Sequence, residues 1–465
     1  MPVNGQIFLQ RSRLRALWFG LDSSFWFRPS LMVLGSIGLA VALLTLDGLF
    51  PDTIQRIPLV YGGGPEAAQT ILSTIASSLI NVVSVTFSIT IVALSLASTQ
   101  FGPRLLNNFM RDQGNQLVLG YFVAIFVYCL LIIRAIRVTD PFTPPLSVTA
   151  GILLAILAFF VLIYFLHHIA SSIKAETLVH MVDKELVKTI EELCPEPMGT
   201  DAEEPEPVPD MPEGFAAESA VVPAMEHGYL QALEIGGLVA LARDKDLVLA
   251  LAYRPGDYIV QGTPLLRAWP GAFLNREIVE AVNDQFVIGS QRTPFQDLEY
   301  AINQLVEIAL RALSPGINDT FTAIGCIDRL GSALSLLARR RMPRTAHRDD
   351  DGALRVVVHP NTFTGAMDAA FDAIRQNSAH HAAVIIRMLE VLQAVAMFAH
   401  TRERREVIHK HADMILRAAE RNLPEENDIR DMRRRHEELT RMLDRSGRDE
   451  HQEKAKKHQA GIVLW

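Results

Sequence analysis

The sequence predicts a mostly α-helical membrane protein, in which a four-helix transmembrane region is followed by a cytoplasmic α+β region. Three observations lead to this fold class. The mean hydropathy of the 465 residues is +0.19, which is high for a protein whose whole surface faces water. The apolar residues cluster before residue 170, in four runs about as long as a membrane helix. Later, short strand-like runs give way to helix-capping patterns, which indicates a small β-domain and a helical C-terminal part.

The four apolar runs are the first elements of this fold. We expect an N-terminal tail over residues 1–30 and a transmembrane domain over 31–170, with spans at about 31–50, 71–101, 117–133 and 147–168. Phe25 to Arg28 precede the first span and are typical of a membrane interface. No small-residue cleavage site closely follows that span, so we expect a signal anchor that stays in the protein.

Lys and Arg beside the spans predict the orientation, because cytoplasmic loops are enriched in both. One side carries nine of them: Arg11, Arg13, Arg15, Arg28, Arg104, Arg111, Lys174, Lys184 and Lys188. The other side carries three: Arg56, Arg134 and Arg137. We therefore expect a multi-pass membrane protein with both termini in the cytoplasm.

The second span carries an uncharged polar face. Polar residues recur there about every 3.5 residues, and Ser77, Asn81, Ser84, Ser88 and Ser95 are the candidate pore-lining residues. Small Ser and Thr side chains can let helices pack closely and hydrogen-bond to one another. Alternatively, the face lines a permeation path formed by several copies of the chain. Both interpretations stay open, and no Asp or Glu in the face supports selectivity through a carboxylate ring.

The chain after the fourth span divides by composition. We expect a helical extension over 171–193, an acidic Pro-rich linker over 194–224, a small β-domain over 225–272, a cytoplasmic helical domain over 273–445 and a charged tail over 446–465. The linker has too little apolar surface to offset the entropy of ordering it. In the β-domain, strand-like runs cover 229–233, 247–253, 258–260 and 265–268, and a further hairpin is expected at 354–359.

Two helix starts in the C-terminal part carry recognisable signals. Thr293, Pro294 and Gln296 resemble a capping box that starts a helix through about Leu313. A second helix is expected near Asp319, with Asn318 as its cap. The loop between the two helices is a candidate cytoplasmic site made of Ser314, Pro315, Gly316, Asn318 and Asp319. The free N–H groups at a helix N-terminus can bind an anion, although the carboxylate of Asp319 in the first turn already complements their partial positive charge.

No pattern nominates a catalytic or cofactor site, so we expect no enzyme and no cofactor. The sequence has no nucleophile elbow, phosphate loop or zinc-protease motif. A metal site is not expected either, because adjacent His380 and His381 point apart, and His409 and His411 do not share a helix face. His167 and His168 are expected to be interfacial anchors of the fourth span. The net charge of −8 without a long basic run argues against nucleic acid as a partner.

Two long stretches identify a family resemblance. They are ILSTIASSLINVVSVTFSITIVALSLASTQFGPRLLNNFMRDQGNQLVLGYFVAIFVYCLLIIRAIR and RTPFQDLEYAINQLVEIALRALSPGINDTFTAIGCIDRL. With them the chain resembles, from about Leu14 to Leu443, a widespread bacterial family of predicted integral membrane proteins of unknown function. The resemblance implies four membrane helices and a cytoplasmic α+β region, and it implies no particular activity. Family members often have Pro after Asn-Asp, where this sequence has Thr320.

Two classes of function fit these features. The favoured one is a homo-oligomeric channel or permeation protein for an ion or small solute, with the polar second span along its path and a cytoplasmic regulatory domain. The alternative is a membrane-tethered sensor or scaffold without transport activity. In both cases the lipid bilayer and other copies of the chain are the expected partners.

Overall fold

The computed structural model describes residues 26–50, 60–101, 112–137, 143–172, 174–198 and 209–462. Contacts divide the chain into two compact units, which we call the membrane unit (within residues 12–177) and the C-terminal unit (chiefly residues 178–465). Most of the predicted N-terminal tail and part of the predicted linker lie outside the described residues. The same holds for six of the basic residues used to predict orientation: Arg11, Arg13, Arg15, Arg56, Arg104 and Arg111.

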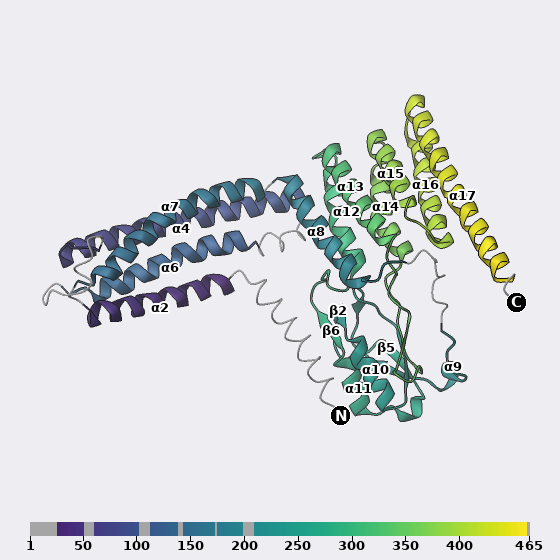
Figure 1. Cartoon of the computed structure of the whole chain (residues 1–465), viewed down its shortest axis with the longest axis horizontal. Helices are drawn as coiled ribbons and strands as arrows, with labels where there is room; N and C mark the ends of the chain where they lie inside the picture. The colour runs from purple at the N-terminus through teal and green to yellow at the C-terminus, as the bar shows by residue number, and fades with distance from the viewer. Residues whose placement is uncertain are drawn as a thin grey trace. The chain divides into compact units, whose positions relative to one another are not determined.

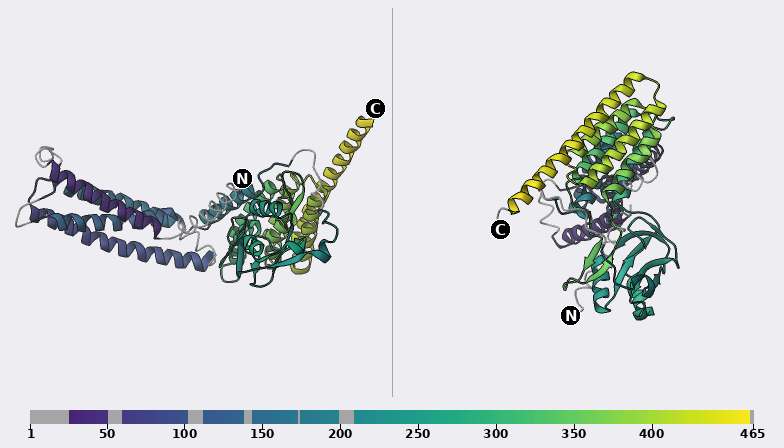
Figure 2. Two further views of the ribbon diagram at one scale, coloured as in Figure 1. Left: turned by 90° about the horizontal axis from the view of Figure 1, so that it is seen from below. Right: turned by 90° about the vertical axis from the view of Figure 1, so that its right-hand side faces the viewer.

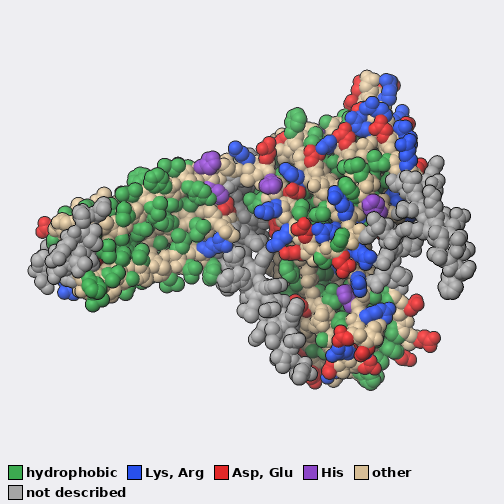
Figure 3. All heavy atoms as spheres, viewed as in Figure 1, with side chains coloured by type: hydrophobic (Ala, Val, Ile, Leu, Met, Phe, Trp, Pro, Cys, Tyr) green, Lys and Arg blue, Asp and Glu red, His purple; other side chains and the backbone are tan. Residues whose placement is uncertain are grey.

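The membrane unit contains four helices that are long and apolar enough to cross a bilayer. They are α2 (Phe27–Leu49), α4 (Pro65–Phe101), α6 (Gln113–Ala135) and α7 (Pro145–Ser172) (Figure 1). Figure 3 shows that hydrophobic side chains cover most of the visible face of these helices. Such helices need lipid on their outer faces, so the predicted class of a four-helix membrane region is confirmed.

Helix α6 forms the centre of the membrane unit. It packs against α2, α4 and α7, and Phe122 and Tyr128 on it are almost completely buried. Gly120 lets α2 approach closely, since a Cβ atom there would lie 2.9 Å from the Cα of Pro29. The other three helices therefore surround α6 and keep much of their own surface exposed.

Six long helices form two layers in the C-terminal unit. Helices α12 (Leu298–Ala312), α14 (Phe363–Asn377) and α16 (Arg402–Asn422) make one layer, and α13 (Thr320–Leu337), α15 (Ala382–Ala396) and α17 (Glu426–Ile462) make the other. Figures 1 and 2 show them side by side, with α8 (Ala175–Leu193) next to α13. Neighbouring helices bury their apolar stripes against one another across both layers.

Two small sheets complete the C-terminal unit. The five-stranded sheet has the order β1-β5-β3-β8-β7, and the three-stranded sheet has the order β4-β2-β6. The strands are β1 (Ala220–Pro223), β2 (Gly228–Leu233), β3 (Val248–Leu251), β4 (Tyr258–Ile259), β5 (Pro264–Trp269), β6 (Phe286–Gly289), β7 (Ala346–Arg348) and β8 (Leu354–Val357). Only β3 and β8 pair in parallel among the described strands.

Four short helices accompany the sheets in the described part of the C-terminal unit. They are α9 (Phe215–Glu218), α10 (Ile235–Asp244), the 3-10 helix η2 (Gly271–Phe273) and α11 (Arg276–Asn283). Two of them, α10 and α11, cover the core. Leu238 on α10 and Val282 on α11 join Leu249 and Leu266 of the sheet in one buried cluster. The class predicted for this part, small sheets followed by helices, is therefore confirmed.

The start of α12 differs from the prediction. The helix begins at Leu298 rather than near Thr293, because Asp297 accepts a hydrogen bond of 2.9 Å from the backbone N–H of Tyr300 and caps the helix. Gln296 does not take part in a capping box. Its side chain instead hydrogen-bonds to the backbone N–H and C=O of Leu233 in β2. The cap of α13 is likewise Asp319 and not the predicted Asn318.

Two predicted boundaries also need correction. The last part of the predicted linker forms β1, which pairs with β5 and is held in the five-stranded sheet. The hairpin predicted at 354–359 is misplaced, because only β8 falls within that range and its antiparallel partner β7 precedes it. Strand β8 also pairs with β3, so this sheet contains residues of the predicted helical domain. In the predicted tail, α17 continues as one helix to Ile462 (Figure 2).

Candidate functional site

The predicted polar residues of α4 point away from the rest of the membrane unit. Ser77, Asn81, Ser84, Ser88 and Ser95 are all exposed, and at 100° per residue they lie within an arc of about 60°. The buried positions of α4 lie on the opposite side of the helix: Ala68, Leu72, Ala76, Leu79, Thr86 and Ala93. Among the described residues, the polar face is therefore not a seam between this chain's own helices.

Two hydroxyl groups of this face are bonded to their own helix. Ser84 donates to the carbonyl of Ile80 at 3.0 Å, and Ser88 donates to the carbonyl of Ser84 at 2.8 Å. Such bonds to the preceding turn satisfy the hydroxyl donor without a neighbouring helix. Ser84 and Ser88 can therefore face lipid, water or another protein surface at little cost in hydrogen bonds.

Asn81 differs from these serines. No hydrogen bond joins its side-chain amide to any other described residue, whereas an amide has two N–H donors and a carbonyl acceptor to satisfy. Lipid tails offer no partner for these groups, so an amide at membrane depth favours contact with water or with another protein. Ser77 and Ser95 have no side-chain hydrogen bond to a described residue either, but the Asn81 amide has the largest unused bonding capacity on this face.

A buried carboxylate near the far end of α2 holds the start of α7. Asp47 is 1% exposed, and it accepts hydrogen bonds from the backbone N–H groups of Leu146 and Ser147, each at 2.9 Å. The Ser147 hydroxyl adds a third bond of 2.6 Å. Free N–H groups at a helix start attract negative charge, so this charged residue has a structural role as the cap of α7.

A second polar contact joins the start of α6 to the last turns of α7. Asp112 caps α6 by accepting from the N–H of Gly114 at 2.7 Å, and its other oxygen lies 2.7 Å from Nε2 of His168. The ring of Tyr164 stacks on His168, with 5.5 Å between the centroids. His168, predicted to be an interfacial anchor, therefore also connects two helices of the membrane unit.

The loop between α12 and α13 uses its polar groups internally. The backbone N–H groups of Asn318 and Asp319 donate to the carbonyls of Ser314 and Ala312. The Asp319 carboxylate accepts from the N–H and the hydroxyl of Thr322, at 3.0 and 2.6 Å. These hydrogen bonds lower the pKa of Asp319. Pro315, Gly316 and Asn318 are exposed, and anion binding at this loop stays a prediction.

The structure brings histidines to partners that the sequence did not indicate. His409 and His436 both approach Asp413, at 3.4 and 2.7 Å, from α16 and α17. His411 is completely buried and lies 3.0 Å from Asp368 of α14. Only the spacing of His409 and Asp413, four residues apart on one helix, was visible in the sequence. Within the described ranges, no group of three or more His, Cys, Asp or Glu could hold a metal ion.

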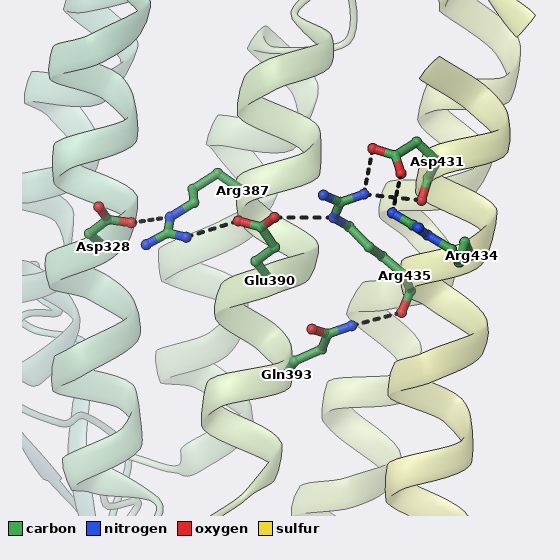
Figure 4. A network of polar contacts seen from close by, with 7 residues as sticks. All are labelled: Asp328, Arg387, Glu390, Gln393, Asp431, Arg434 and Arg435. Carbon is green, nitrogen blue, oxygen red and sulfur yellow. Dashed lines mark hydrogen bonds and ion pairs between the residues drawn. The ribbon is translucent and has the colours of Figure 1, made fainter. Parts of the chain in front are cut away.

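A chain of alternating charges crosses the second helix layer. Arg387 on α15 pairs with Asp328 on α13 and, at 2.8 Å, with Glu390 (Figure 4). Glu390 also pairs with Arg435 on α17 at 3.1 Å, and Arg435 pairs with Asp431. The hydrogen bond from Arg387 lowers the pKa of Glu390. These partly exposed groups connect three helices, and nothing about them points to a bound ligand.

Comparisons with known proteins support the resemblance found in the sequence. A family model described as "Predicted membrane protein (DUF2254)" matches residues 22–394, from before α2 into α15. Uncharacterized proteins from Mycobacterium bovis and Mycobacterium tuberculosis are each 29% identical to this chain over 428 residues, which is 90% of this chain and 80% of theirs. No solved structure gives a significant match.

Proposed function

The chain belongs to the family of predicted membrane proteins described as DUF2254, and from this premise we propose that it forms a homo-oligomeric channel or permeation protein. In this assembly the polar face of α4 lines the path, and the C-terminal unit assembles or regulates it without enzymatic turnover. Both termini lie in the cytoplasm, and the four helices cross the inner membrane of a bacterium. The permeant species is an ion or small solute.

The outward direction of the polar face is the observation that carries this proposal. The face lies opposite the buried side of α4, so a single copy of the membrane unit leaves it in contact with lipid. Several copies arranged with their α4 faces inward would give Asn81 either water or a neighbouring amide as a partner. The serines between the copies would add polar lining without charge.

The scaffold or sensor remains the second candidate, because one observation favours it. The hydroxyls of Ser84 and Ser88 are already satisfied by their own helix, so small side chains on this face could pack closely against another copy without any path between them. The two candidates therefore share the same subunit contact. They differ in whether water reaches it.

Cysteine accessibility separates the two. Cysteines placed singly at Ser77, Asn81, Ser84 and Ser88 in a reconstituted, Cys129-free protein should react with a small charged thiol reagent if the face is wetted. Matched controls are Val85→Cys and Phe87→Cys, whose native side chains are 58% and 47% exposed on the two flanks of the face. These positions should stay unreactive, because lipid excludes a charged reagent.

Two outcomes contradict the channel. Uniform protection of the four polar positions favours the scaffold, and equal reactivity of the flanks means that water access is not specific to the face.

The proposed orientation of the termini has its own test. A reporter that is active only in the periplasm should be silent when fused after Trp465, and strong periplasmic activity contradicts cytoplasmic termini.

A further inference from the structure

The most exposed large apolar side chain of the described residues lies in the C-terminal unit and not on the lipid-facing helices. Phe321, in the first turn of α13, is 86% exposed, and Ile317 in the preceding loop is 42% exposed. Asp319 between them caps α13 through Thr322, so the turn that presents both side chains is held in place. Phe321 and Ile317 therefore form an exposed apolar pair at a fixed position on the surface of the C-terminal unit.

Two ion pairs show how α8 lies along α13. Asp183 of α8 is 3.5 Å from Arg329 of α13, and Glu191 is 3.8 Å from Arg340, just beyond the end of α13. From the first ion pair to the second, the residue number rises on both sides, so α8 and α13 run parallel to each other. Ala175 begins α8 eight residues before Asp183, and Phe321 lies eight residues before Arg329. With a rise of 1.5 Å per residue, both are about 12 Å along their helices from that ion pair.

The covalent chain ties this end of α8 to the membrane. Helix α7 ends at Ser172 and α8 begins at Ala175, three residue steps later, so the gap between them is at most about 11 Å. Helix α7 has 28 residues, or about 42 Å, which matches the roughly 40–45 Å of a bilayer with its headgroups. Helix α8 therefore starts close to the headgroup layer.

We propose that the turn carrying Ile317 and Phe321 contacts the lipid surface of the membrane that the chain itself spans. The parallel course of α8 and α13 places this turn at the end of α8 nearest to the membrane. Aromatic rings are favoured at the boundary between headgroups and acyl chains. The exposed Lys174, just before α8, is suited to the anionic headgroups of the same surface. The contact would fix how far the C-terminal unit stands from the bilayer, and it does not rest on a permeation path.

A fluorophore on residue 321 of the full chain tests this contact. The native cysteines do not compete for the label, because Cys129, Cys194 and Cys326 are buried, and burial raises the pKa of the Cys194 thiol to about 11 and that of Cys326 to about 12. Phe321→Cys is labelled with an environment-sensitive dye and reconstituted into vesicles of phosphatidylcholine and phosphatidylglycerol. A second set of vesicles has nitroxide groups on its acyl chains, which quench only dyes that touch lipid.

The control is Phe273→Cys, at the end of η2 beside β1 and β5, where the native side chain is 54% exposed. The dye at residue 321 should lose about half of its emission in the nitroxide vesicles, as expected for a group at the membrane boundary, and the dye at residue 273 should lose none. Equal emission from residue 321 in both vesicles overturns the proposal. A dye at residue 321 that is shielded from water but not quenched also overturns it, and identifies protein, such as a second copy, as the cover.

Discussion

The two units satisfy their polar side chains in different ways. In the C-terminal unit, charged side chains pair across helices, and Arg387, Glu390 and Arg435 connect α13, α15 and α17 (Figure 4). In the membrane unit, Ser84 and Ser88 of α4 bond to the backbone of their own helix. Asp47 bonds to the free N–H groups at the start of a neighbouring helix.

This difference follows from the solvent of each unit. In water, partly exposed ion pairs can link helices, and each pair stabilises the fold only modestly. Lipid tolerates a polar group only when that group is already bonded. Ser84 and Ser88 meet this condition within their own helix, while the Asn81 amide has no bonded partner among the described residues. An amide has two N–H donors and a carbonyl acceptor to satisfy, so Asn81 is the residue of this face that gains most from a partner outside the chain.

Removing the Asp47 carboxylate should give the largest effect on stability. Asp47→Ala leaves the N–H groups of Leu146 and Ser147 without their acceptor, which should cost about 2–3 kcal/mol of unfolding free energy. Asp47→Asn keeps one acceptor oxygen and should cost less than half as much. Unfolding of both variants in mixed micelles measures this, and equal losses would contradict a capping role.

His411 should make the C-terminal unit sensitive to acid. Burial lowers the pKa of His411, against the opposing effects of Asp368 and Asp372, while Lys410 acts with burial. Since the folded protein disfavours the protonated ring, stability is intact above the unfolded pKa of about 6.5 and is lost as the pH falls below it. His411→Leu should flatten the fall in Tm between about pH 7 and pH 5. The exposed His380→Leu should not, and an unchanged slope in His411→Leu would show that another group titrates.

Breaking the chain of alternating charges across α13, α15 and α17 should lower stability less than removing the Asp47 carboxylate. Glu390→Gln removes the negative charge and one of the two acceptor oxygens that Arg387 and Arg435 share. It should lower stability by about 0.5–1 kcal/mol, and by less in high salt, because these groups are partly exposed. The pKa of Glu390 is lowered, so its contribution is present at neutral pH and is lost as acid protonates it. The control, Glu406→Gln, weakens an exposed pair with Arg402 on α16 and should lower stability less than Glu390→Gln does, because solvent screens exposed pairs.

The smallest effect is expected at Ser84. Its hydroxyl bonds only to the carbonyl of Ile80 among the described residues, so Ser84→Ala should change stability by less than about 0.5 kcal/mol. Ser84→Ala should also leave the association of the copies unchanged, which sedimentation in detergent checks. A clear loss of association would show that the Ser84 hydroxyl has a partner outside its own helix.

The sequence was sufficient to predict the four membrane helices, because a long apolar run has few possible structures other than a membrane-spanning helix. It was not sufficient for the start of α12. Thr293, Pro294 and Gln296 carry a helix-start pattern, yet Gln296 bonds to Leu233 of β2, 63 residues away in the chain, and Asp297 takes the capping position. Local patterns cannot report such a tertiary competitor. For the same reason β1 was hidden in an acidic, Pro-rich segment whose strand partner, β5, comes about 45 residues later.

The polar face of α4 was visible in the sequence because its spacing follows the helical period. The direction of that face was not visible, since it depends on which side of α4 packs against α6. The partners of the histidines were hidden as well. Asp413 meets His436 from another helix, 23 residues away in the chain, and no periodicity predicts that contact.

Conductance across planar bilayers tests the central claim most directly. The purified protein should conduct, and Asn81→Leu should lower the conductance while leaving the oligomer mass unchanged, because the polarity of the lining controls whether a narrow path stays wetted. Val85→Leu, on the flank of the same helix, should conduct like the unaltered protein. No conductance from an intact oligomer, or equal conductance in all three proteins, would contradict a path lined by α4.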